Sequence, residues 1–150
     1  IPFVKHWQNY GKNNVQPFIQ FFESNNLIYS HQFGFRQKFS TSYALIDLPI
    51  NIKKNIDQGY FGCGIFVDFE KAFDTIDHNI LINKLKYYGI KGKENEWFNS
   101  YLTNRKQFVC LNGIDSDLQD VKCGVPQGSI LGPLLFLVYI NDLHKAIRYC

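Results

Sequence analysis

The sequence lacks methionine, a secretory leader and any apolar run long enough to cross a membrane. The missing methionine predicts that the chain is a fragment whose true start lies upstream. The missing leader predicts no secretory signal, and therefore an intracellular protein, cytoplasmic or nuclear. The longest apolar run, residues 130–140, is too short for a bilayer and contains Gly132 and Pro133, so no membrane partner is expected.

The sequence also has no dominant charge and no metal-binding cysteine pattern. A net charge of +3, from 16 Lys+Arg against 13 Asp+Glu, permits a polyanionic partner without requiring one. No two cysteines have C-x-x-C spacing and no histidine clusters with them, which argues against a zinc site. We expect reduced thiols rather than a disulfide framework. The 45% hydrophobic content, with 14 Phe and 9 Tyr, is typical of a globular chain.

Apolar spacing predicts helices in the first third of the chain. Residues 15–22 have helical periodicity that ends at a polar Ser-Asn-Asn stretch. Residues 31–40 are polar, aromatic and basic, which is typical of a loop. A second helix is predicted over residues 41–58, stopped by Gly59, and Pro49 within it should kink or split it.

The remaining sequence predicts a mixture of strands and helices. Residues 60–69 contain the short apolar run Ile-Phe-Val, which is typical of a strand buried on both faces. Helices are then predicted over 74–88, 93–102 and 129–147, with a tight turn over 124–128. Strands are predicted over 107–111 and 118–122, joined by a loop containing Asn-Gly, a hairpin signal. This order predicts an α+β fold with helices on one face of a small sheet.

Carboxylates after the predicted buried strand are candidates for metal binding. Asp68 lies at the strand exit, where it could hold a Mg²⁺ ion that also contacts a phosphate. A solvated strand end is an equally good explanation of Asp68 from spacing alone. Asp74 and Asp77 are better explained by capping of the next helix, with Asp74 as the N-cap.

Two further segments could contact nucleic acid. Residues 122–133 form a glycine-rich turn before a helix, and Gln127 there offers both a donor and an acceptor. In residues 31–40, aromatic rings alternate with Arg36 and Lys38, an arrangement that suits phosphates and bases. A plain turn and a surface loop anchored by buried phenylalanines remain the alternatives. Arg105 belongs to a weaker basic pair with the same alternative.

Three ordered motifs turn these separate signals into one resemblance. Residues 32–36, 66–78 and 124–133 read QFGFR, FVDFEKAFDTIDH and GVPQGSILGP, and residues 97–105 and 139–143 read WFNSYLTNR and YINDL. Together they resemble the reverse transcriptase domain of non-LTR (LINE-type, jockey-like) retrotransposons. The resemblance covers nearly the whole chain, most clearly from about residue 22 onward.

The resemblance implies a fragment of the polymerase right hand, with fingers and palm built as a small antiparallel sheet backed by helices. Residues from about 1 to 59 would be fingers-side helices and loop, and residues from about 60 to 150 would be palm. The family's aromatic-x-Asp-Asp motif should follow shortly after residue 143, and the sequence stops at Cys150 before it. The basic fingers residues that hold the triphosphate, and the thumb, are likewise expected in other parts of the full-length protein.

The resemblance also assigns roles to individual residues. Asp68 matches the catalytic, metal-binding aspartate, and Phe73 matches the bulky residue under the incoming sugar that excludes ribonucleotides. Phe69 and Gln127 would contact the nucleotide. The residues expected to hold template or primer are Phe35, Arg36, Lys38, Arg105, Gly124, Pro126, Gly128 and Ser129.

The implied reaction is phosphoryl transfer with two Mg²⁺ ions, from a dNTP to a primer 3′-hydroxyl on an RNA template. Asp68 supplies one carboxylate where at least two are needed, so we expect the fragment itself to be inactive. One alternative is a non-catalytic, nucleic-acid-binding remnant of a mobile element. Another two-metal palm enzyme, such as a nucleotide cyclase, is disfavoured by the 124–133 segment.

Overall fold

The structure is a computed structural model that describes residues 15–146. Contacts divide the chain into two compact units, and we describe each by itself. The larger unit is Ile1–Ile28 with Lys71–Cys150, and the smaller unit is Tyr29–Glu70. The assignment of residues from about 1 to 59 to the fingers and from about 60 to 150 to the palm stays a prediction.

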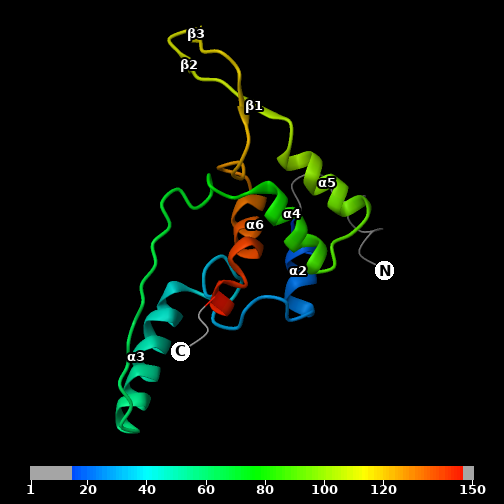
Figure 1. The fold of residues 1–150 in the computed structure, drawn as a ribbon. Coiled ribbons are helices and arrows are strands. Elements are labelled where there is room, and N and C mark those ends of the chain that lie inside the picture. The colour runs from blue at the N-terminus through cyan, green and yellow to red at the C-terminus, as the bar shows by residue number, and fades with distance from the viewer. Residues whose placement is uncertain (1–14, 147–150) are drawn as a thin grey trace. The chain divides into compact units, whose positions relative to one another are not determined.

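The larger unit is held together by helices that pack on one another (Figure 1). Helix α4 contacts both α5 and α6, and its leucines 81 and 85 are fully buried. In α6, five of the ten residues are buried apolar side chains on more than one face, as expected for a central helix. The helices are α2 (Gln16–Ser24), α4 (His78–Tyr87), α5 (Lys93–Leu102) and α6 (Leu131–Ile140), followed by the 3₁₀ helix η1 (Leu143–Ala146).

Aromatic rings and a polar network join these helices. Phe18 of α2 lies 5.4 Å from Phe98 of α5, centroid to centroid. Asn141 donates from Nδ2 to the Leu27 carbonyl (2.6 Å) and to the Tyr88 hydroxyl (2.8 Å). These hydrogen bonds connect the end of α6 to the chain after α2 and to the end of α4.

Lys84 of α4 pairs with Asp142 and also donates to the Tyr139 carbonyl at the end of α6. Burial alone would raise the pKa of Asp142, but the hydrogen bond and the charge of Lys84 outweigh it and hold that pKa below its usual value. Asp142 therefore stays ionised to a lower pH than an unpaired aspartate would.

Helix α4 begins at His78 because Asp77 caps it. Asp77 Oδ1 accepts from the backbone N–H of Ile80 at 2.9 Å. The helix ends at Tyr87, and Gly89 follows with a φ of 98° that favours glycine. The expectation that the helix begins at residue 74 with Asp74 as its cap is therefore wrong, because residues 74–77 are not helical and the helix begins only at His78.

Removing this cap should destabilise the larger unit. We expect Asp77→Ala to lower the free energy of unfolding by about 1 kcal/mol, because the Ile80 N–H loses its acceptor. Asp77→Ser keeps an acceptor and should retain most of the stability. Urea unfolding of the 150-residue chain measures both. Equal losses in the two variants would contradict a capping role.

The strands form a narrow, exposed ribbon instead of a sheet covered by helices. Strand β1 (Arg105–Gln107) pairs antiparallel with β4 (Gln119–Val121), and Lys106 faces Asp120 across the pair. Strand β2 (Cys110–Leu111) pairs with β3 (Ile114–Asp115) at the tip of the ribbon (Figure 1). The predicted hairpin is confirmed, but most of its side chains are exposed, so the expected backing by helices is wrong in the described residues.

The turn at the tip follows from its sequence. Asn112 and Gly113 both have positive φ, 53° and 79°, as a two-residue turn between right-twisted strands requires. Ser116 joins the two ladders, because its N–H donates to the Val109 carbonyl and its hydroxyl accepts from the Val109 N–H, each at 2.9 Å. The ribbon is therefore one continuous hairpin with an irregular middle.

The smaller unit contains α3 (Thr41–Asp57) and an extended segment, residues 60–69. Helix α3 runs through Pro49 without a break, so of the expected kink or split, the split is wrong. The side-chain amide of Asn51 donates to the Asp47 carbonyl at 3.0 Å in the turn around the proline. The carbonyl that loses its donor to the proline is that of Leu45, so the Asn51 bond does not replace the missing hydrogen bond.

The extended segment 60–69 corrects a second expectation. It is not a strand, and Phe66 is 86% and Val67 64% exposed. A strand buried on both faces needs neighbouring strands and covering layers. No strand in residues 15–146 pairs with this segment, so its apolar run stays open to solvent.

No helix in residues 15–146 is long and apolar enough to span a bilayer.

Candidate functional site

Two segments far apart in the sequence, residues 73–78 and 124–129, are bonded together in the larger unit. The backbone N–H of Gly124 donates to the Ile76 carbonyl at 2.8 Å, and that of Val125 donates to the Phe73 carbonyl at 2.9 Å. His78 is buried, and its Nε2 lies 2.7 Å from the carbonyl oxygen of Gly124. A carbonyl only accepts, so His78 carries its proton on Nε2 in this contact.

Gly124 allows the two segments to approach this closely. Its φ is +83°, and a Cβ placed there would lie 2.8 Å from both the Cα and the carbonyl oxygen of Asp74. It would also lie 3.0 Å from the Phe73 carbonyl oxygen. Those atoms belong to backbone that is already bonded to this turn, so only glycine fits.

The side chains of the two segments are also connected. Gln127 donates from Nε2 to Asp74 Oδ1 at 2.7 Å, and both side chains are exposed. Asp74 therefore pairs with the turn and does not cap a helix. Our sequence interpretation proposed a site role for Gln127 but did not connect it to Asp74.

The turn is stabilised by its own hydrogen bonds before α6 begins. The hydroxyl of Ser129 donates to the Pro126 carbonyl at 2.7 Å and accepts from the Gly132 N–H at 3.0 Å. This engagement gives Ser129 a structural role in the turn. Gly128, with a φ of +78°, is exposed and has open space around its Cα.

A cavity of about 690 Å³ lies between this turn and the base of the ribbon. It brings Arg105 together with Gly124, Pro126 and Gln127, four residues that sequence reasoning proposed separately. Its charged residues are three cations and two carboxylates, with Lys106 Nζ 3.8 Å from Asp120 Oδ1. The lining is Asp74, Arg105, Lys106, Gln107, Asp120, Val121, Lys122, Cys123, Gly124, Val125, Pro126 and Gln127.

Sequence reasoning gave no site role to Lys122 or His78, and it noted Lys106 only beside Arg105 in the weaker basic pair. Lys106 precedes one predicted strand and Lys122 ends the other, and pairing of the strands brings both lysines to the same cavity. Only a hairpin register of the kind observed could have placed them there. His78 gave no local signal, because its partner is a backbone carbonyl 46 residues away.

Phe73 is half-buried beside this site. Its ring lies 5.0 Å from that of Phe136 in α6, with an angle of 46° between the planes. Phe73 therefore has a packing role in the structure, and its role beside a nucleotide stays a prediction from the sequence.

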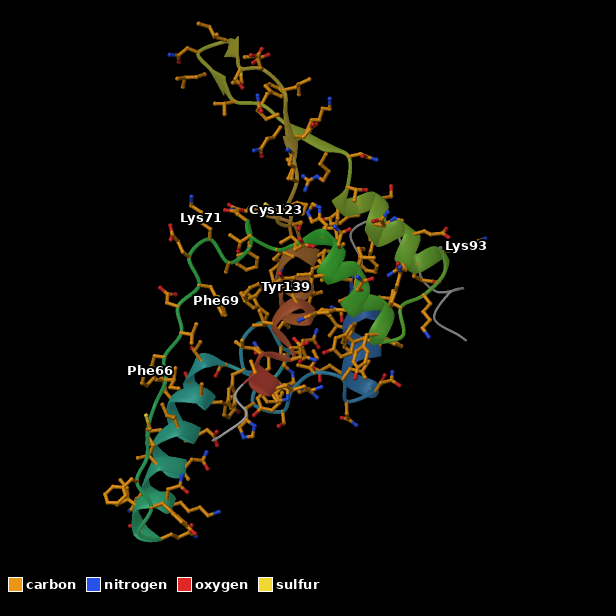
Figure 2. The ribbon with its side chains drawn as sticks, in the orientation of Figure 1. Phe66, Phe69, Lys71, Lys93, Cys123 and Tyr139 are labelled. Atoms are coloured by element: carbon orange, nitrogen blue, oxygen red, sulfur yellow. The ribbon has the colours of Figure 1, made fainter. Side chains whose placement is uncertain are left out.

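The other predicted site residues belong to the smaller unit. Asp68 is exposed on the extended segment, and Phe69 on the same segment is 44% exposed (Figure 2). Among the described residues, no group of three or more His, Cys, Asp or Glu side chains is placed to hold a metal ion. Asp68 has the right chemistry for Mg²⁺, an exposed carboxylate, but these residues do not assemble a complete ligand set.

In the basic loop of the smaller unit, residues 31–40, the side chain of Arg36 contacts neighbouring residues of the chain. Arg36 Nη1 donates to the carbonyls of Tyr29 and Gln32, each at 3.3 Å, and the guanidinium lies 4.1 Å from the Phe39 ring centroid. Phe35 and Lys38 have positive φ values, 56° and 65°, and both are exposed. This loop is a defined turn structure in which Arg36 has a clear local role.

Comparisons with known proteins cover nearly the whole chain. A family model described as "Reverse transcriptase (RNA-dependent DNA polymerase)" matches residues 4–150. "Probable RNA-directed DNA polymerase from transposon BS" of Drosophila melanogaster is 33% identical over 145 residues, 93% of this chain and 15% of that protein.

Two further Drosophila melanogaster relatives are similar. "Probable RNA-directed DNA polymerase from transposon X-element" is 32% identical, with 83% of this chain and 14% of that protein covered. "RNA-directed DNA polymerase from mobile element jockey" is 31% identical, with 75% and 12% covered. The chain thus spans between 12% and 15% of the length of these three relatives.

Proposed function

Because the chain belongs to the reverse transcriptase (RNA-dependent DNA polymerase) family, we propose that it is part of the polymerase of a non-LTR retrotransposon. That polymerase would transfer a nucleotide from a dNTP to a DNA primer 3′-hydroxyl on an RNA template. The observation that carries the proposal is the junction of segments 73–78 and 124–129. It bonds the end of the FVDFEKAFDTIDH motif, residues 73–78, to the start of the GVPQGSILGP motif.

Each part of the junction suits contact with nucleotides or strands. Phe73 and Gln127, with Phe69, are proposed to contact the incoming nucleotide. Arg105 lines the same cavity as the turn, where its guanidinium could pair with a backbone phosphate. Gly128 is exposed with open space beside it, which leaves the backbone there open to close approach by a strand. Gly124, Pro126, Gly128 and Ser129 are the proposed template or primer contacts.

Metal binding is part of the same proposal. Asp68 would hold Mg²⁺, and carboxylates from other parts of the full-length protein would complete its ligand set. When bound, the two ions would lower the pKa of the primer 3′-hydroxyl and stabilise the charge of the transferring phosphoryl group. We therefore expect the 150-residue chain alone to bind nucleic acid without extending a primer.

Nucleic-acid binding by the isolated chain tests the cavity. We expect Arg105→Gln and Lys122→Gln each to weaken binding to a primed RNA template. Each should also lower the slope of log K against log salt by about 0.7–0.9, the effect of one lost phosphate contact. Lys93→Gln is the matched control, because Lys93 lies at the far end of α5 from the ribbon (Figure 2). Fluorescence anisotropy at several salt concentrations measures the slopes.

The exposed cysteines locate the bound strand independently. Cys123 lines the cavity and Cys110 lies in strand β2, and both thiols are free and exposed. Bound template–primer should slow alkylation of Cys123 and leave Cys110 at its original rate. Unchanged slopes at Arg105 and Lys122, with equal protection of both thiols, would exclude the cavity as the binding site.

Lys38→Gln is expected to lower the slope in the same way through the smaller unit.

A further inference from the structure

We propose that Asp74 is a positioning residue for Gln127, whose side-chain amide it holds in one orientation in front of the cavity. The proposal rests on the proposed function of Gln127 as a nucleotide contact. The geometry that carries it is the 2.7 Å hydrogen bond from Gln127 Nε2 to Asp74 Oδ1, made between two side chains that line the same cavity.

The chemistry of the two groups selects the orientation. A primary amide has a donor end and an acceptor end, which exchange places when the side chain flips by 180°. An ionised carboxylate accepts and cannot donate, so it bonds only the Nε2 end of Gln127. The flipped amide would put Oε1 against Asp74 Oδ1, where two acceptors repel. Asp74 therefore leaves Oε1 of Gln127 to accept from a donor on the substrate, such as an amino group of a base or a sugar hydroxyl.

The backbone keeps this pair together. Phe73, next to Asp74, accepts from the N–H of Val125, two residues before Gln127. The closely packed Gly124 adds a second backbone bond to the same segment. The two side chains thus start from backbones already bonded to one another, so their contact costs little additional ordering.

A purely structural role explains the pair less well. Both side chains are exposed, and a hydrogen bond that competes with water adds little to stability. Helix α4 is capped by Asp77 and not by Asp74. Among the described residues, Gln127 is the hydrogen-bond partner found for the Asp74 carboxylate.

The first experiment tests the hydrogen bond in the 150-residue chain by NMR of ¹⁵N-labelled side-chain amides. In the unsubstituted protein, the two Nε2 protons of Gln127 should have widely separated shifts that move together as Asp74 is titrated with acid. Asp74→Ala should collapse that separation and remove the pH dependence, with an unchanged thermal melt. Asp115→Asn, at an exposed position in β3, is the control that should leave the Gln127 signals unaltered. If Asp74→Ala leaves the separation of the Gln127 proton shifts and its pH dependence unchanged, the proposal is overturned.

The second experiment measures steady-state incorporation of a matched dNTP by the full-length polymerase that contains this segment. We expect Asp74→Ala and Gln127→Ala each to lower kcat/KM about tenfold, the factor for one well-oriented hydrogen bond, and the double variant to lose no more than either alone. The kcat/KM of Asp74→Asn should be intermediate between that of these alanine variants and that of the unsubstituted enzyme. Its amide can accept from Nε2 or donate to Oε1, so it permits both orientations of Gln127.

The outcomes separate this proposal from the one on which it rests. If Gln127→Ala impairs incorporation while Asp74→Ala does not, Gln127 contacts substrate without help from Asp74 and the positioning role is refuted. If the NMR signals report the hydrogen bond but neither variant changes kcat/KM, the proposed function of Gln127 fails. If the double variant loses kcat/KM by the product of the two single-variant factors, Asp74 does not act through Gln127 and the proposal is refuted.

Discussion

Gly124→Ala is expected to destabilise the larger unit by about 3 kcal/mol. Alanine at a φ of +83° costs roughly 1 kcal/mol in backbone strain alone. The added methyl group would also lie 2.8 Å from the Cα and carbonyl oxygen of Asp74, which side-chain rotation cannot relieve. The segments must separate to accommodate it, which would break the Gly124–Ile76 and Val125–Phe73 hydrogen bonds. Chemical denaturation of the 150-residue chain measures the loss.

Gly128→Ala is the matched control for this prediction. Gly128 lies in the same turn with nearly the same φ, +78°, but a Cβ there meets no atom within 4 Å. The stability that Gly128→Ala loses should be limited to the backbone strain, about 1 kcal/mol. If the two variants lose equal stability, close approach of the two segments is not the reason for glycine at position 124.

Phe73→Val is expected to reduce the discrimination of the full-length polymerase between dNTP and rNTP by about tenfold or more. An apolar ring beside the incoming sugar offers no partner to a 2′-hydroxyl, which would clash with it or stay unsatisfied at a cost of about 1–3 kcal/mol. Valine is smaller and leaves room for the hydroxyl and a water molecule. The ratio of kcat/KM values for matched dNTP and rNTP measures the change, alongside a thermal melt.

Phe136→Val distinguishes this role from packing. Phe73 and Phe136 pack against one another, so both substitutions should remove part of the same ring contact and lower the melting temperature. Only Phe73→Val should alter the discrimination ratio. A ratio that stays constant in Phe73→Val while both variants lose stability would mean that Phe73 is simply a packing residue.

Local sequence signals were sufficient for the elements that local physics determines. Helix α5 has the predicted bounds, 93–102, and the Asn112–Gly113 turn forms as expected because few residue types adopt positive φ without strain. The family resemblance is confirmed, since three long motifs in a fixed order identify a family more specifically than any single residue.

Predictions that depend on tertiary surroundings were less successful. Residues 60–69 have the composition of a buried strand, but burial depends on neighbours that no described segment provides. Asp74 and Asp77 are both suitable caps by spacing, and the choice between them depended on where the helix could start. The partners of Asp74 and His78 lie 53 and 46 residues away, beyond the reach of any local pattern.

The junction between segments 73–78 and 124–129 also has a consequence for the order of folding. Closing a chain over about fifty residues has an entropic cost that must be met before its contacts can stabilise it. Helices α4 and α5 and the hairpin need only neighbouring residues, so they can form first and shorten the effective loop. During synthesis, segment 73–78 is made about fifty residues before its partner. We therefore expect the candidate site to be among the last parts of the larger unit to form.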